Sequence, residues 1–224
     1  MENLGKLEVW TLDVGGWHLV FNSTTITMTL IVMGLLILFG WLATREKSFI
    51  PNPFQVVGEL FVTAFWKLTQ DALPEKLAKQ YFPLICVLFM FLFLCNSIGM
   101  FPGMDEPTKD LNTTLGLGFL GFFIAHYCGI RSKGFGGYCK EYFQPIFFMM
   151  PLNVIGELSK VVSISFRLYG NIMGGAIIIL VVSHLVYSLV FPPFLYLFFG
   201  LFVGAVQAFV FTMLTLVYIS VQVN

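Results

Sequence analysis

Charged residues are scarce in this sequence. Only 11% of its 224 residues are Asp, Glu, Lys or Arg, against about 25% in an ordinary soluble domain. Hydrophobic residues make up 58%, which is more apolar surface than a soluble fold of this size can bury. Lys and Arg total 12, as do Asp and Glu. The zero net charge excludes a basic nucleic-acid-binding protein and an acidic disordered chain. We therefore expect the fold to lie in the lipid bilayer.

The sequence also lacks the motifs of catalysis and metal binding. None of its four cysteines belongs to a C-x-x-C pair, so neither a disulfide framework nor a metal site is expected. There is no H-E-x-x-H motif, no paired nucleophile and base, and no G-x-x-x-x-G-K-[S/T] loop for phosphate. Lys6 is the only basic residue among residues 1–22, which is unlike a cleaved signal peptide. We expect no catalytic residue, no metal, no cofactor and no cleaved leader.

Long apolar runs are what the sequence does contain. A helix needs roughly 20 apolar residues to cross about 30 Å of hydrocarbon. Three runs of that length are followed by two longer ones, at 24–43, 82–101, 111–130, 151–189 and 194–223. A helix of about 35 residues is roughly 50 Å long, so it must be steeply inclined to remain in the membrane. We interpret the last two runs as a long inclined hairpin, with Pro192-Pro193 as its turn.

The predicted fold is a single all-α, polytopic membrane domain over 1–224. It has five membrane-embedded helices and one amphipathic helix on the membrane surface, at 54–70. The apolar face of this surface helix is formed by Phe54, Val57, Phe61, Ala64, Phe65 and Leu68. The third run contains Gly116, Gly118 and Gly121, and small residues of this kind suit close helix packing in lipid.

Basic residues predict the orientation of the chain in the membrane. Eight of them lie in the two connections assigned to one side: Arg45, Lys47, Lys67, Lys76, Lys79, Arg131, Lys133 and Lys140. Only Lys6 and Lys109 lie on the other side. We therefore expect the N-terminus (1–23) outside, those two connections and the helix at 54–70 on the cytoplasmic side, and the C-terminus in the cytoplasm.

Three ionisable residues lie inside the fourth apolar run: Glu157, Lys160 and Arg167. At about 100° per residue, these three and Asn171 fall within about 80° of one another on a helical wheel, with Ser163 beside them. An isolated charge at the centre of a bilayer costs at least ~2.5–3.5 kcal/mol. The stripe should therefore face protein or water rather than lipid tails.

These charges allow a structural and a functional interpretation. Glu157 and Lys160 are three positions apart on a helix and could simply neutralise each other. Arg167 is different, because no acidic residue follows it in the sequence. Its counter-charge must come from Glu157, from an earlier span or from another polypeptide. Since an arginine does not lose its proton, it is a poor relay but a good permanent barrier.

Small residues surround the continuation of this stripe: Gly170, Gly174, Gly175 and Ala176. Glycine in a membrane helix usually marks the close approach of another backbone, here either within the chain or on a separate moving partner. In the last run, Gln207 and Tyr218 fall within about 20° of each other and form a second polar line that could face Arg167. His184 is expected to be a hydrogen-bonded packing residue.

Four sequence motifs stand in order along the chain. They are NSIGMFPG at 96–103, DLNTTL at 110–115, SKVVSISFRLYGN at 159–171 and QAFVFTMLTLVY at 207–218. The third resembles the pattern S/A-K-P-x-S-L-x-x-R-L-F-G-N, and the fourth resembles Q-A-F-x-F-x-x-L-x-x-x-Y. Both patterns belong to subunit a of F-type ATP synthases, and the first two motifs resemble the end of one helix and the start of the next in that family. The first 80 residues are similar to the family only in layout.

The resemblance implies a non-catalytic stator subunit that translocates ions, while other subunits of the complex handle ATP. Arg167 matches the arginine that faces the ring of rotor c subunits, each of which binds the transported ion on a membrane-embedded carboxylate. This arginine would attract the ionised carboxylate and prevent leakage between two offset half-channels for H⁺ or Na⁺. Asn171 and Gln207 match positions expected to support it. Peripheral-stalk b subunits and the lipid bilayer are further implied partners, and the long hairpin would lie against the rotor ring.

The sequence departs from the family pattern at two places. Val161 replaces the Pro that follows the Lys, which should change only local helix shape. Ala176 and Gly200 stand where many members carry an acidic residue and a His or other polar partner. The candidates that remain to line the half-channels are Glu157, Asn153, Ser163, Asp110 and His184. Lys160 and Tyr218 are further candidate residues for ion translocation.

The missing polar pair bears on the transported ion. A proton can use a chain of titrating groups, whereas Na⁺ needs a hydrated path and oxygen ligands, so Na⁺ coupling is more plausible here than in the family at large. Selectivity, however, resides in the rotor subunit, and H⁺ stays the first expectation. The resemblance and the N-terminal sequence favour a bacterial plasma (inner) membrane.

A self-contained secondary ion transporter is the alternative function. Such folds usually contain internal repeats with a substrate site at broken helices. No internal repeat is detectable in this sequence, and five spans cannot form two equal halves. The stator subunit is therefore the preferred interpretation.

Overall fold

The computed structural model describes residues 9–14, 17–44, 53–101, 103–142, 150–185 and 191–223. Five of its helical segments are long and apolar enough to cross a membrane. They are α1 (Ser23–Thr44), α3 (Glu75–Ser97, extended by a 3₁₀ turn at Ile98–Met100), α4 (Leu111–Lys133), α6 (Met150–Leu185) and the segment Pro193–Val223, which includes α8 (Gly204–Val223). The all-α, polytopic fold class is confirmed.

The shorter elements complete the chain. They are β1 (Val9–Val14), β2 (Trp17–Asn22), α2 (Pro53–Ala72), a 3₁₀ turn at Pro107–Lys109, α5 (Phe135–Tyr142), α7 (Phe191–Tyr196) and a π-helical segment at Leu197–Val203. β1 and β2 form a two-stranded antiparallel hairpin that pairs Val9 with Asn22 and Val14 with Trp17. This hairpin was not predicted from the sequence, although its valines and aromatic residues favour strands.

Helix boundaries differ from the apolar runs in two places. α3 begins at Glu75 rather than at residue 82, because its polar first turns continue the helix and bury Ala78 and Tyr81 against neighbouring helices. The assignment of Pro192-Pro193 to a turn was wrong, since both prolines lie in the first turn of α7. Proline is compatible with that position because the first amides of a helix have no partner within it. Residues 186–190 lie outside the described part of the chain.

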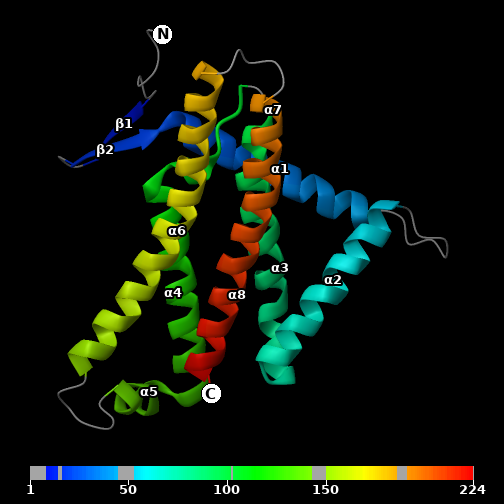
Figure 1. Ribbon diagram of the computed structural model, residues 1–224. Helices are drawn as coiled ribbons and strands as arrows, with labels where there is room; N and C mark the ends of the chain where they lie inside the picture. The colour runs from blue at the N-terminus through cyan, green and yellow to red at the C-terminus, as the bar shows by residue number, and fades with distance from the viewer. Residues whose placement is uncertain are drawn as a thin grey trace.

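α6 and α8 run antiparallel beside each other, with α4 behind them (Figure 1). Glycines on α4 allow this approach. A Cβ at Gly118 would collide with the Ser165 hydroxyl of α6, and a Cβ at Gly121 would touch Thr215 of α8. The close packing expected of the third span is therefore present at these two glycines. Gly116, in contrast, has no neighbour within 4 Å.

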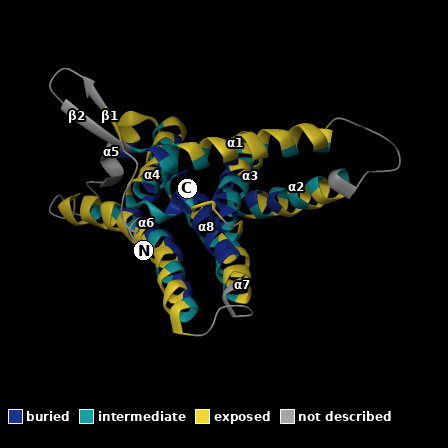
Figure 2. Ribbon diagram, turned by 90° about the horizontal axis from the view of Figure 1, so that it is seen from above, coloured by how far each residue is buried: buried dark blue, intermediate teal, exposed yellow. Residues whose placement is uncertain are grey.

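Buried side chains gather where α3, α4 and α8 meet, whereas α1 is exposed along most of its length (Figure 2). One cluster joins α3, α6 and α8 through Leu88, Leu92, Ile164, Leu168, Ala208 and Phe211. This cluster fixes the face of α6 that turns inward. The opposite face of α6 is consequently left open.

α2 packs against α3 through aromatic side chains. Phe65 lies 4.8 Å from Phe89 between ring centroids, and Trp66 lies 5.2 Å from Phe82 in an edge-on arrangement. Of the apolar face expected for this helix, Phe61 and Phe65 turn toward α3, while Val57 is exposed. The placement of α2 on the cytoplasmic membrane surface stays a prediction. Arg45 and Lys47, which contribute to the predicted orientation, lie outside the described residues.

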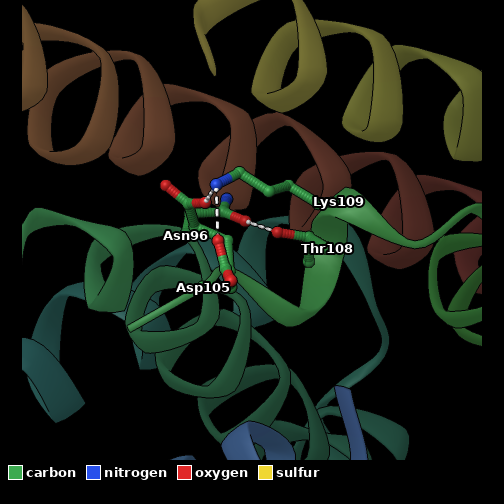
Figure 3. A network of polar contacts seen from close by, with 5 residues as sticks. Asn96, Asp105, Thr108 and Lys109 are labelled. Carbon is green, nitrogen blue, oxygen red and sulfur yellow. Dashed lines mark hydrogen bonds and ion pairs between the residues drawn. The ribbon is translucent and has the colours of Figure 1, made fainter. Parts of the chain in front are cut away.

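Asn96 joins three distant segments at the end of α3. It is fully buried, and its Nδ2 donates to the Gly204 carbonyl at 3.0 Å. Its Oδ1 accepts from the Thr108 hydroxyl at 2.9 Å (Figure 3). These bonds tie the start of α8 and the turn Pro107–Lys109 to α3. The first family-like motif therefore begins at a structural junction.

Replacing Asn96 with Ala should destabilise the fold measurably. The change leaves the Gly204 carbonyl and the Thr108 hydroxyl without this partner, and an unpaired buried polar group costs about 1–3 kcal/mol. We expect a lower midpoint of thermal denaturation for the detergent-solubilised protein. The control is Asn112→Ala, which removes the same amide from an exposed position on α4. Equal midpoints for the two variants would contradict the structural role of Asn96.

Candidate functional site

The polar stripe of α6 lies beside the face that this helix packs against its neighbours. Glu157 and Lys160 form an ion pair of 2.6 Å between Oε1 and Nζ. The same ammonium lies 5.3 Å from the centroid of the Tyr218 ring on α8, within the range of a cation–π contact. The structural interpretation of Glu157 and Lys160, that each neutralises the other, agrees with this geometry.

Asn171 and Gln207 connect α6 to α8 further along the hairpin. Asn171 Nδ2 donates to Gln207 Oε1 at 2.7 Å, and the Gln207 side chain is only 4% exposed. The second polar line therefore faces α6, with Gln207 reaching Asn171 and Tyr218 reaching Lys160. The sequence suggested that this line could face Arg167, which forms no hydrogen bond with either described side chain. These two contacts lie on either side of Arg167, about one turn away on one side and about two turns on the other.

Arg167 projects from the exposed side of α6, while its neighbour Leu168 is fully buried. It forms neither a hydrogen bond nor an ion pair with any residue in the described part of the chain. Glu157, which the sequence allowed as its counter-charge, is occupied by Lys160. A guanidinium cannot discharge itself by losing a proton. Its compensation must therefore come from outside the set of residues that the structure describes.

The glycines after Arg167 divide into two groups. A Cβ at Gly175 would lie 3.0 Å from the Phe199 ring, so this glycine serves packing within the chain. Gly170 and Gly174 have nothing within 4 Å of an added Cβ, and Gly174 lies within about 20° of Arg167 on the helical wheel. At these two positions near Arg167 the helix carries no side chain and has no neighbour, which permits close approach of another helix.

Two cavities open toward opposite ends of the α6–α8 hairpin. The loop-side cavity, of about 420 Å³, reaches Asn171 and is bounded on one side by the loop between α3 and α4. Its polar and titratable lining residues are Asp105, Glu106, Lys109, Asn171, Ser183 and Tyr196. Ala176 and Gly200, the positions that depart from the family pattern, line this same cavity.

The second cavity, here called the C-terminal-side cavity, has a volume of about 280 Å³. It is lined by Leu152, Asn153, Gly156, Glu157, Lys160, Val221 and Gln222. Arg167 lines neither cavity. The residues at which the two cavities end, Lys160 and Asn171, are eleven positions apart, which is about 16 Å along a helix. Arg167 lies between them.

Three sequence-predicted residues lie apart from this arrangement. Asp110 caps α4, with Oδ1 accepting from the Asn112 amide at 2.9 Å and Oδ2 accepting from the Thr25 hydroxyl at 3.5 Å. Ser163 is exposed on the open side of α6, and His184 is exposed near the end of that helix. None of the three lines either cavity.

The charged residues Asp105 and Glu106 of the α3–α4 loop were not predicted from the sequence as site residues. Lys109 Nζ pairs with a carboxylate oxygen of Asp105 at 3.1 Å (Figure 3). The same ammonium pairs with a carboxylate oxygen of Glu106 at 2.5 Å. Burial would lower the pKa of Lys109, but hydrogen bonds and ionic attraction to Glu106 and Asp105 outweigh it and raise the pKa. The available signal was a dense group of charges, D-E-P-T-K-D at 105–110, in a chain that has few.

Known proteins resemble this chain over most of its length. The profile of the family described as ATP synthase A chain matches residues 26–220. ATP synthase subunit a of Moorella thermoacetica is 39% identical over 197 residues, which cover 88% of this chain and 89% of the relative. ATP synthase subunit a 1 of Crocosphaera subtropica is 37% identical over 210 residues, 93% of this chain and 90% of the relative.

A third relative, ATP synthase subunit a of Desulforamulus reducens, is 35% identical over 214 residues, which cover 91% of this chain and 82% of the relative. The family profile extends across all five candidate spans and includes the polar stripe of α6. The resemblance first seen in four short motifs thus holds for nearly the whole chain. The chain belongs to the family of ATP synthase subunit a.

Proposed function

We propose that this chain is the ion-translocating stator subunit of an F-type ATP synthase, with Arg167 as the barrier between two offset half-channels. The loop-side cavity forms one half-channel and the C-terminal-side cavity forms the other. The observation that carries this proposal is the position of Arg167 between the ends of the two cavities, lining neither. The two cavities share no lining residue in the described part of the chain, so in this proposal an ion is carried past the arginine by another subunit.

The charge of Arg167 would explain both how ion release is coupled to the partner subunit and why ions do not leak between the half-channels. A partner that carries an ion on a membrane carboxylate would be neutral when loaded and negative when unloaded. Two opposite unit charges 4 Å apart attract by about 4 kcal/mol at an effective dielectric constant of 20. The arginine therefore favours release of the ion and holds the empty carboxylate. The same positive charge repels a free cation that would otherwise leak between the half-channels.

The open face of α6 is the surface proposed to meet the ring of rotor c subunits. Arg167 is exposed there, and Gly170 and Gly174 present no side chain that would hold a partner helix away. An arginine without a described partner on a lipid-facing surface is costly, and a carboxylate on the rotor would compensate it. Peripheral-stalk b subunits complete the proposed stator by analogy with the family.

The residues beside the barrier have distinct proposed roles. The hydrogen bond between Asn171 and Gln207 closes the inner end of the loop-side cavity and positions the turn of α6 next to Arg167. Glu157, Lys160 and Tyr218, with Asn153 at the mouth, supply polar groups at the C-terminal-side cavity. With the N-terminus outside a bacterial inner membrane, the loop-side cavity would face the exterior. Catalysis on ATP would take place on other subunits.

Replacing Arg167 with Ala should abolish ion-driven ATP synthesis while the complex still assembles. The barrier charge disappears, so the unloaded carboxylate is no longer held and ions leak. The measurement is ATP synthesis by the purified complex in proteoliposomes under an imposed ion gradient, together with the rate of passive gradient decay. The control, Arg131→Ala, removes an exposed arginine near the end of α4. Full coupled synthesis by the Arg167 variant would rule out the barrier role.

Replacing Glu157 with Gln should slow ion flux without uncoupling it from ATP turnover. The amide keeps the size of the side chain but cannot titrate or form the ion pair with Lys160. Flux and ATP hydrolysis should fall together, measured as ATP-driven gradient formation per ATP consumed. Glu59→Gln is the control, because Glu59 is exposed on α2 and bonds only to Gln55 among the described residues. Unchanged rates would leave Glu157 with a structural role alone.

The expected transported ion is H⁺. ATP-driven acidification of proteoliposomes should then be independent of Na⁺ concentration and be abolished by a protonophore. Millimolar Na⁺ that stimulates ATP hydrolysis, with transport that resists the protonophore, would instead assign Na⁺ to this enzyme.

A further inference from the structure

The loop-side cavity has one polar wall and one apolar wall. Its α6 wall beyond Asn171 is formed by Ile172, Met173, Ala176, Ile177, Ile179, Leu180 and Ser183. None of these side chains titrates. The π-helical segment adds Phe199 and Gly200. The carboxylates and the ammonium that line the cavity come only from the α3–α4 loop, within the part of the chain that is described.

Three charged side chains of this loop are in ionic contact, and they differ in how far each is exposed to solvent. The Asp105 side chain is 67% exposed, that of Lys109 is 29% exposed, and that of Glu106 is 11% exposed. Lys109 contacts both carboxylates, so the three groups form a connected series from solvent to the cavity. Glu106 is the innermost titratable group of the series.

The position of Glu106 is fixed by a 3₁₀ turn of the backbone and by the space beside Gly99. The amide of Lys109 donates to the Glu106 carbonyl at 3.0 Å, which closes a 3₁₀ turn and places the two side chains on one side. Asn96 anchors that turn through Thr108. The Glu106 carboxyl fills the space in which Gly99 lacks a side chain, and a Cβ at position 99 would collide with it.

We propose that Glu106 is the titrating group of the loop-side half-channel, with Lys109 as its fixed positive partner. This inference rests on the proposed function and names a residue within it. A proton from hydronium in the outer water binds a Glu106 carboxylate oxygen, leaving water behind. The protonated carboxyl then gives the proton to cavity water on the side of Asn171, and the carboxylate returns to its pair with Lys109. No other bond is made or broken.

Few charged or titratable groups lie near Glu106 among the described residues. Lys109 and Asp105 lie in the same loop, and Tyr196 reaches the cavity from α7. Gly99, in the 3₁₀ turn that extends α3, lies against the Glu106 carboxyl, and Asn96 of α3 bonds to Thr108. From α6, Asn171 and Ser183 line the cavity, and neither is charged. Asp110 is committed to Asn112 and Thr25 instead. The half-buried Lys109 is therefore the one cation beside the Glu106 carboxylate among the described residues.

The test compares Glu106→Gln with Glu75→Gln in the purified complex in proteoliposomes. Glu75 is also a lysine-paired glutamate, but it is 70% exposed and lines neither cavity. Loss of a proton-transfer group should lower gradient-driven ATP synthesis by about tenfold or more. It should also flatten the dependence of the rate on pH in the compartment that this cavity faces. Glu75→Gln should change neither.

Rescue distinguishes proton transfer from a structural role. Ala176 lines the same cavity from α6, so Ala176→Glu in the Glu106→Gln background should restore both rate and pH dependence, whereas Ala176→Gln should not. A lower rate with an unchanged pH profile and no rescue would make Glu106 a structural residue and overturn the inference. Wild-type behaviour of Glu106→Gln would overturn it equally.

A second variant, which keeps Glu106, tests the proposal even if the Glu106→Gln complex does not assemble. Lys109→Met removes the positive partner, which favours the neutral carboxyl, so the pH dependence should move to higher pH. An unmoved profile would contradict the proposal. Arg167→Ala in the same assay separates this inference from the proposed function. If that variant uncouples while Glu106 and Lys109 variants behave as wild type, only the role of Glu106 fails.

Discussion

An arginine that has no counter-charge among the described residues is the constraint on which this structure depends. Arg167 lies in a helix that must cross lipid, and the one acidic residue of that helix, Glu157, is paired with Lys160. An unpaired charge in hydrocarbon costs several kcal/mol, even when flanking water relieves part of it. The rest of the hairpin is arranged around this charge. Leu168 is packed inward, Gly174 leaves the outer surface open, and a polar contact to α8 lies on each side.

Much of the fold follows from hydrophobic length alone. Runs of about 20 apolar residues must be helical because lipid offers the backbone no hydrogen bonds, and five such segments are present. Boundaries are less accessible from the sequence. Apolar runs mark hydrocarbon rather than helix, so the polar start of α3 at Glu75 was missed. Pro192-Pro193 signals a break in a helix, but its position inside the first turn of α7 depends on which amides remain unpaired.

The site residues that lie on one helix, α6, could be predicted from the sequence. Those that come together from separate segments could not. The stripe from Glu157 to Asn171 follows from the helical repeat, and the line of Gln207 and Tyr218 meets it across the hairpin. Asp110 was chosen for its charge, yet its place before α4 makes it a helix cap. Glu106, in contrast, lines the loop-side cavity but was not predicted, because it is distant in sequence from α6. Only the folded loop, anchored by Asn96, brings this carboxyl to the cavity that reaches Asn171.

We expect the partner of Arg167 to belong to another subunit. A density map of the intact complex in a lipid environment, resolved well enough to show side chains around α6, would reveal that partner. The account predicts a carboxylate from a rotor helix facing the Arg167 guanidinium, with that helix passing over Gly170 and Gly174. An Arg167 guanidinium paired to an acidic residue of its own chain, or covered by lipid alone, would contradict the account.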